Sequence, residues 1–164
     1  MPQHNWLPPL TYRAGRTDDD YLSALNLQYQ KDFHEEKIIY EDEPICIKRH
    51  PLINGYEATL WHLVTDNRHL SSDPVSDPRC EKLSWIKAIL TQYDNEHPQD
   101  ILYWENMRKG EKRLLHYLVP ERYLVVLTQR NGYKLFWTAY PVFYKHEHKT
   151  LMEEHSLYQT RSPH

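Results

Sequence analysis

The last third of the chain carries four strand-like runs whose links are too short to join parallel neighbours. The runs are DILYWENMR, EKRLLHYL, RYLVVLTQ and YKLFWTAYPV, and the links between them are KG, VPE and NG. Because parallel strands need a crossover of a dozen or more residues, these links predict an antiparallel meander. Asn131-Gly132 is a strong short hairpin signal and predicts a type I′ turn.

Helical patterns lie on both sides of this predicted sheet. DDDYLSALNLQYQKDFHE carries an apolar stripe at helical spacing. A second helix is predicted over SDPRCEKLSWIKAILTQY, where Asp77 can cap and Pro78 can begin it, and a third over FYKHEHKTLMEEHSLYQ. Helices followed by strands predict an α+β fold, with N-terminal helices packed on a four-stranded antiparallel meander sheet and a C-terminal helix.

The remaining segments are short. Residues 37–40 and 44–49 are predicted as two strands around an acidic turn, and YEATLWHLVTD as another strand, because it is partly alternating and β-branched or aromatic. Residues 66–77 are a polar loop, a candidate contact for a substrate or partner. Residues 1–17, with three prolines, are predicted as an irregular arm. We expect one domain, 1–164.

Composition narrows the class of protein. No apolar run approaches the roughly 18 residues of a membrane span, and MPQHNWLPPL lacks the regions of a secretory signal. With Cys46 and Cys80 as the only cysteines, a cytoplasmic protein with reduced thiols is the simplest interpretation. A net charge of −3 argues against non-specific coating of nucleic acid, so any such contact needs a local cationic pocket.

Two hydroxyls mark the last predicted strand, GYKLFWTAYPV. Thr138 and Tyr140 lie two residues apart, so the period of two places both on one face of the sheet. The same count adds to that face Lys134, Phe136 and Val142, and assigns to the other face Trp137 and Ala139. Thr138 and Tyr140 are either ordinary strand formers with satisfied hydroxyls or part of a reactive face.

Two further side chains are candidates for a functional site. His62 is flanked by apolar residues, so it is either a core histidine with a hydrogen-bond partner or a group with a perturbed pKa at a site. Arg79 lies in the first turn of a predicted helix, where the helix dipole disfavours a cation. It is solvated, paired with Asp77, or placed there for an anion that the free N–H groups also bind.

Other chemistries find little support. His146, His148 and His155 lack a carboxylate or cysteine to complete a tetrahedral metal set, and Cys80 is more simply a small buried thiol. The sequence has no GxSxG, Walker or HExxH motif. We therefore expect no cofactor and no metal ion.

RYLVVLTQRNGYKLFWTAYPV resembles the C-terminal hairpin of the barnase–EndoU–colicin–RelE superfamily of metal-independent RNases, in its phage- and mobile-element-associated branches. KRHPLINGYEATLWHL and RCEKLSWIKAIL are similar to segments that short bacterial proteins pair with that ending, so the resemblance covers most of 44–158. It implies N-terminal helices before a four-stranded antiparallel sheet, and RNA cleavage without a metal. The TAY ending maps onto Thr138 and Tyr140, and the central histidine onto His62.

The implied chemistry assigns roles to these candidates. The 2′-hydroxyl of RNA attacks the neighbouring phosphate, which needs a base, an acid and cations. His62 would be base or acid, with Thr138 and Tyr140 orienting the phosphate or donating hydrogen bonds. The predicted phosphate-binding cations are Arg49, Arg79 and Lys112, and the side chains expected to stack on a base are Trp61, Trp104 or Trp137.

Three functions are compatible with the sequence. The first is a toxin-like endoribonuclease of a mobile element, with an RNA substrate and a neutralising antitoxin or immunity protein as partner. The second is a non-catalytic module that binds RNA or protein on the same fold. The third is another enzyme, such as a nucleotide transferase, for which the sequence carries no motif.

Overall fold

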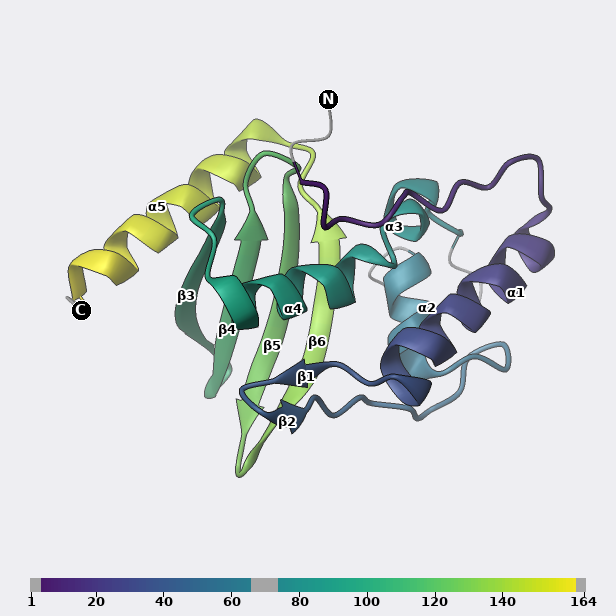
Figure 1. Cartoon of the computed structure of the whole chain (residues 1–164), viewed down its shortest axis with the longest axis horizontal. Helices are drawn as coiled ribbons and strands as arrows, with labels where there is room; N and C mark the ends of the chain where they lie inside the picture. The colour runs from purple at the N-terminus through teal and green to yellow at the C-terminus, as the bar shows by residue number, and fades with distance from the viewer. Residues whose placement is uncertain (1–3, 66–73, 162–164) are drawn as a thin grey trace.

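The computed structural model describes residues 4–65 and 74–161, and these form an α+β fold as predicted (Figure 1). The helices are α1 (Asp18–Tyr29), its π-helical continuation η1 (Gln30–Glu35), α2 (Ala58–Val64), α3 (Asp77–Glu81), α4 (Trp85–Glu96) and α5 (Lys145–Arg161). The strands are β1 (Ile39–Tyr40), β2 (Glu43–Pro44), β3 (Ile101–Arg108), β4 (Glu111–Leu118), β5 (Tyr123–Arg130) and β6 (Tyr133–Pro141). Most of the predicted polar loop, residues 66–73, lies outside the described residues.

The four long strands form the predicted meander. Their order is β3-β4-β5-β6, and each pairs antiparallel with the next. The turn prediction is wrong at Asn131-Gly132, where only Gly132 has a positive φ, of 85°. The type I′ pattern, with positive φ at both central residues, occurs instead at Lys109 (52°) and Gly110 (78°), between β3 and β4.

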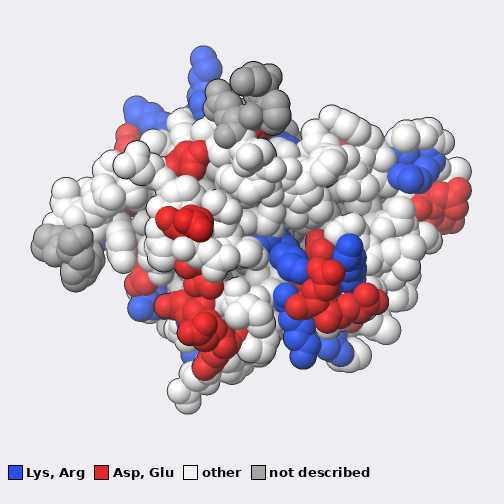
Figure 2. Space-filling view, viewed as in Figure 1, with Lys and Arg blue, Asp and Glu red and all other residues white. Residues whose placement is uncertain are grey.

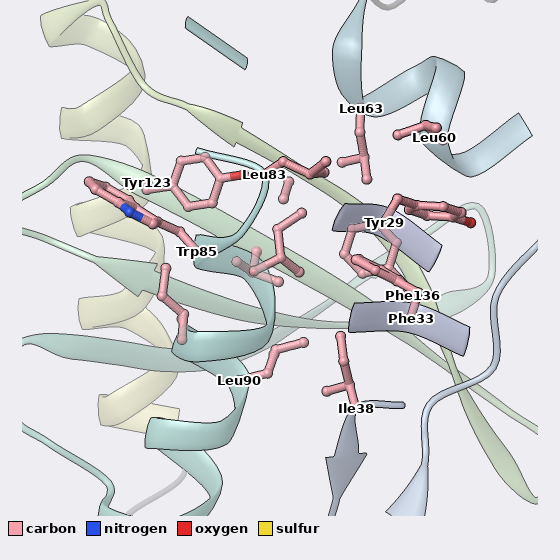
Figure 3. Packing of buried hydrophobic residues seen from close by; sticks show 14 of the residues in the cluster. Tyr29, Phe33, Ile38, Leu60, Leu63, Leu83, Trp85, Leu90, Tyr123 and Phe136 are labelled. Atoms are coloured by element: carbon pink, nitrogen blue, oxygen red, sulfur yellow. The ribbon is translucent and has the colours of Figure 1, made fainter. Parts of the chain in front are cut away.

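Both faces of the sheet are covered by helices. Phe33 of η1 meets Phe136 of β6 edge to face, with ring centroids 5.4 Å apart (Figure 3). On this first face α4 packs with strand residues that include Leu114, Leu118, Val125 and Leu127. On the second face α5 contributes Leu151, Met152 and Tyr158, which pack on a cluster that includes Trp104, Leu115, Tyr117, Leu124 and Val126. Strand residues therefore alternate between two cores.

A β-bulge in β6 overturns the predicted assignment of its faces. Val126 pairs with Thr138, but the next residue, Leu127, pairs with Phe136, so Trp137 is the extra residue. Phe136 and, after the bulge, Ala139 both belong to the core on the α4 face. Thr138 and Tyr140 still share a face, as predicted, but it is the α5 face and it is not shared with Phe136.

Most of YEATLWHLVTD, Ala58–Val64, forms a helix rather than the predicted strand. Its seven-residue helix α2 has buried residues almost all around, namely Thr59, Leu60, Trp61, Leu63 and Val64. Its strand-like composition reflects that burial, since tertiary packing outweighs local propensity. The helix predicted over residues 76–93 is likewise interrupted, because hydrogen bonds from Leu83 to Cys80 and from Trp85 to Lys82 span three residues and separate α3 from α4.

From residue 4 to residue 17 the N-terminal arm is irregular, as predicted, and it is tied to the helices. The indole of Trp85 donates to the Pro8 carbonyl (2.9 Å), and the Thr11 amide donates to the Glu81 carbonyl (2.9 Å). Arg13 forms an ion pair with Asp77 (2.6 Å). The predicted strand 37–40 shortens to β1, whereas the prediction for 44–49 is wrong beyond Pro44, where β2 ends. β1 and β2 pair antiparallel.

His116, on β4, is fully buried beside Tyr40 of β1. Its Nε2 accepts a hydrogen bond from the Tyr40 hydroxyl (2.8 Å), and its Nδ1 donates to the Val125 carbonyl (3.3 Å). Each ring nitrogen of the neutral imidazole thus has a hydrogen-bond partner. Burial lowers the pKa of His116 to about 3.

We expect His116 to make stability depend on pH. Between about pH 6.5 and about pH 3 the imidazole is protonated in the unfolded chain but neutral in the folded chain. The free energy of unfolding therefore decreases as the pH falls through this window. The stability advantage of the wild type over His116→Gln should shrink by about 1.4 kcal/mol per pH unit between pH 6 and 4, measured by urea unfolding. The exposed His146→Gln variant is the control, and a difference independent of pH would contradict a neutral buried His116.

Candidate functional site

Helix α2 lies beside β6 and brings His62 to the last strand. The distance between His62 Nε2 and Thr138 Oγ1 is 3.1 Å, within hydrogen-bonding range. His62 is half-buried, and Thr138 reaches it because the bulge turns this residue away from the α4 core. The contact joins two predicted site residues that are 76 positions apart in the sequence.

Arg79 connects α3 to the same place. Its Nε donates to the Leu63 carbonyl (3.2 Å) and an Nη donates to the His62 carbonyl (3.0 Å). Both carbonyls lie in the last turn of α2, where a cation is favoured by the helix dipole. The guanidinium carbon also lies 6.0 Å from the centroid of the Tyr140 ring. Asp77, its expected alternative partner, pairs with Arg13, so Arg79 is a positioning residue for α2.

Tyr140 completes the group of four predicted residues. It is half-buried, and this burial raises the pKa of its phenol above the ordinary value. The hydroxyl is therefore protonated at neutral pH and can donate a hydrogen bond. His62, Arg79, Thr138 and Tyr140 thus converge at one end of β6, on its α5 face and the adjoining α2.

Two hollows flank Trp137, which lines both of them. One, of about 160 Å³, is bounded by His62 and Lys48 together with Ala58, Thr59, Leu135 and Phe136. The other, of about 200 Å³, is bounded by Thr138 and Tyr140 together with residues that include Asn106, Arg108, Arg113 and Glu154. Trp137 is 41% exposed, so it presents an aromatic surface between the two hollows.

Arg113 supports Trp137 from beneath. Its guanidinium carbon lies 4.0 Å from the centroid of the indole ring, and an Nη donates to Thr128 Oγ1 (2.8 Å). Glu111 lies 3.6 Å from the same guanidinium. The cation is buried against the ring, and the burial lowers the pKa of Arg113 from its usual value. Sequence reasoning missed Arg113, although it shares the face of Leu115 and Tyr117 in the alternation of β4.

Three predicted substrate contacts lie elsewhere. Trp61 is 3% exposed and stacks on Tyr56, and Trp104 is 0% exposed and donates its indole N–H to Glu154 (2.8 Å). Neither ring is available to a base. Lys112 lies on the α4 face of β4, opposite to Thr138, and pairs with Glu105 (3.1 Å). These predictions were wrong because the alternation of residues in a predicted strand does not show which of its two faces is covered by other elements.

Arg49 belongs to a different group of side chains. It is exposed, and its guanidinium donates to His34 Nδ1 (3.2 Å). His34 Nε2 in turn donates to Glu57 (2.9 Å), which also accepts from the Tyr29 hydroxyl (2.7 Å). The preceding residue, Lys48, lines the hollow with His62 instead. The expected cation is therefore displaced by one residue within the run Lys48, Arg49, His50.

Compared with known proteins, the chain matches no family model, no curated protein and no solved structure. Within residues 4–65 and 74–161, no three His, Cys, Asp or Glu side chains form a group that could hold a metal ion. No helix in these ranges is long and apolar enough to cross a membrane. The resemblance to the RNase superfamily stays a prediction, and the site is defined by its geometry alone.

The contact between His62 and Thr138 can be measured by a double-mutant cycle. We expect Thr138→Val to lower the free energy of unfolding by about 1 kcal/mol, because a hydrogen bond is lost. The same substitution should cost much less in a His62→Ala background, as urea unfolding would report. A cycle of Thr138→Val with the exposed His146→Ala is the control and should be additive. Additivity in the His62 cycle as well would contradict the hydrogen bond.

Proposed function

We propose that the chain is a metal-independent endoribonuclease that cleaves RNA by 2′-hydroxyl transesterification. The observation that carries the proposal is the 3.1 Å contact between His62 and Thr138 beside the aromatic surface of Trp137. An acid–base group, a protonated phenol, an exposed ring and cations lie together there. Transesterification of RNA needs these kinds of groups.

The reaction is assigned to these side chains as follows. His62 Nε2 takes the proton of the 2′-hydroxyl, whose oxygen forms a bond to the adjacent phosphorus. The bond from phosphorus to the 5′ oxygen breaks, and that oxygen takes a proton from the Tyr140 hydroxyl. The products are a 2′,3′-cyclic phosphate and a 5′-hydroxyl, after which His62 returns the proton to Tyr140 through solvent.

Other groups bind the RNA in this proposal. Lys48 and the exposed Arg108 lie at the two hollows and attract the phosphates, while a base stacks on the exposed side of Trp137. Local cations serve this purpose in a chain whose net charge is −3. From the resemblance we further propose that the enzyme is toxin-like, acts in the cytoplasm of bacteria, and is neutralised by a protein that covers this face.

The central test is RNA cleavage in the presence of EDTA. Wild-type protein should cut single-stranded RNA with and without chelator and leave cyclic phosphate ends. His62→Ala should slow cleavage about 10²- to 10⁴-fold, because a general base contributes that much. The His146→Ala variant, altered on the exposed surface of α5, should cut like wild type. Cleavage that is abolished by EDTA, or that persists in His62→Ala, would overturn the mechanism.

Binding can be separated from cleavage with 2′-O-methyl RNA, which lacks the attacking hydroxyl. Trp137→Ala should weaken its binding about 5- to 150-fold, the loss expected for one base stacked on an aromatic ring. Tyr133→Ala, altered at an equally exposed ring at the start of β6, is the matched control. Fluorescence anisotropy measures both. Binding through Trp137 without any cleavage of normal RNA would identify the alternative, a non-catalytic RNA-binding module.

A further inference from the structure

Another hollow lies away from this site, between the arm, the helical unit α1–η1 and α4. Its volume is about 810 Å³, which falls within the range of roughly 300–1,000 Å³ typical of small-molecule pockets. In Figure 2 the region between α4 and η1 shows acidic and basic side chains side by side. The hollow uses none of the residues assigned to RNA cleavage.

The walls of this hollow are built into the fold. Trp6 and Leu10 of the arm line it, and so does Ala88 of α4. The arm is held there by the hydrogen bonds of Trp85 to Pro8 and of Thr11 to Glu81. The apolar wall is therefore anchored to the helices that it adjoins.

Asp32 places a carboxylate in the polar part of the lining. It lies in the π-helical turn η1, a kind of turn that is frequent at functional sites, and it is 6% exposed. Among the described residues its only hydrogen-bond partner is the amide of Gln28 (3.0 Å). The nearby Lys87 ammonium is bound to Glu36 (2.5 Å) instead. Burial raises the pKa of Asp32, and it outweighs the opposing effects of the Gln28 hydrogen bond and of the Lys87 and Lys31 ammonium groups.

Ser84, the N-cap residue of α4, supplies a second uncompensated polar group. Its side chain is 8% exposed, and within the described chain its Oγ has no hydrogen-bond partner. Buried polar atoms are normally paired, so each exception asks for an explanation. Here a carboxylate and a hydroxyl from different elements, both short of partners, line the same hollow.

We propose that this hollow binds a small organic cation, an amine or guanidine with an apolar body. The cationic nitrogen donates to the free positions of the Asp32 carboxylate, and the apolar body packs against Trp6 and Leu10. A bound N–H donor supplies the partner that a buried carboxylate requires. Ser84 contributes a hydrogen bond to a polar group at the other end of the ligand.

The test uses the full chain labelled with ¹⁵N and the probe 2-phenylethylamine. Its neutral analogue, 2-phenylethanol, has nearly the same shape. Amide resonances on both walls, such as those of Asp32 and Ala88, should shift saturably with the amine. The dissociation constant for the amine should be about tenfold lower than that for the alcohol. Asp32→Asn should reduce the affinity for the amine to that for the alcohol. Glu35→Gln removes an exposed carboxylate from the same turn and should leave binding unchanged.

Stability without ligand gives an independent measurement. Asparagine can still accept the hydrogen bond from Gln28, so Asp32→Asn should be at least as stable as wild type once the buried charge is removed. A clearly less stable variant would show that Asp32 is structural and would overturn the proposal. Equal binding of amine and alcohol, no saturable shift, or equal effects of Asp32→Asn and Glu35→Gln would overturn it as well.

Discussion

The surroundings of the candidate site depend on one extra residue in β6. Without the bulge at Trp137, the period of two would turn Thr138 and Tyr140 toward the same face as Phe136, into the α4 core. The bulge lets Phe136 and Ala139 fill that core while both hydroxyls face the α5 side. It also places the Trp137 ring over Arg113. One local irregularity thus reconciles a continuous core with a polar face on the same strand.

Most of the fold could be predicted because its signals are local. Short links dictate an antiparallel meander, and the apolar stripe of α1 and the apolar periodicity of α4 follow helical spacing. Helix α2 escaped prediction because nearly every one of its residues is buried, so no polar face reveals a period. The bulge escaped it because no residue in FWTA marks an insertion, and only the pairing with Val126 and Leu127 reveals it.

The candidate site could be predicted only in part. His62, Arg79, Thr138 and Tyr140 were found from chemistry and resemblance, and the fold brings them together. The role expected of Arg79 was different, since its guanidinium binds carbonyls of α2. Lys48 was passed over for Arg49 because neighbouring residues in an extended segment project to opposite sides, and only the packing decides which one reaches the hollow.

Helix α2 is held at both ends by side chains from other elements. At its start, Glu57 is bound by Tyr29 and His34, and at its end Arg79 holds two carbonyls. A seven-residue helix has little stability of its own, so its position is set by these external contacts. The orientation of His62 therefore depends on contacts that α2 makes with α1, η1 and α3. Substitutions of side chains that touch neither hollow should therefore also affect the site. The site should keep or lose its geometry together with the helical half of the fold.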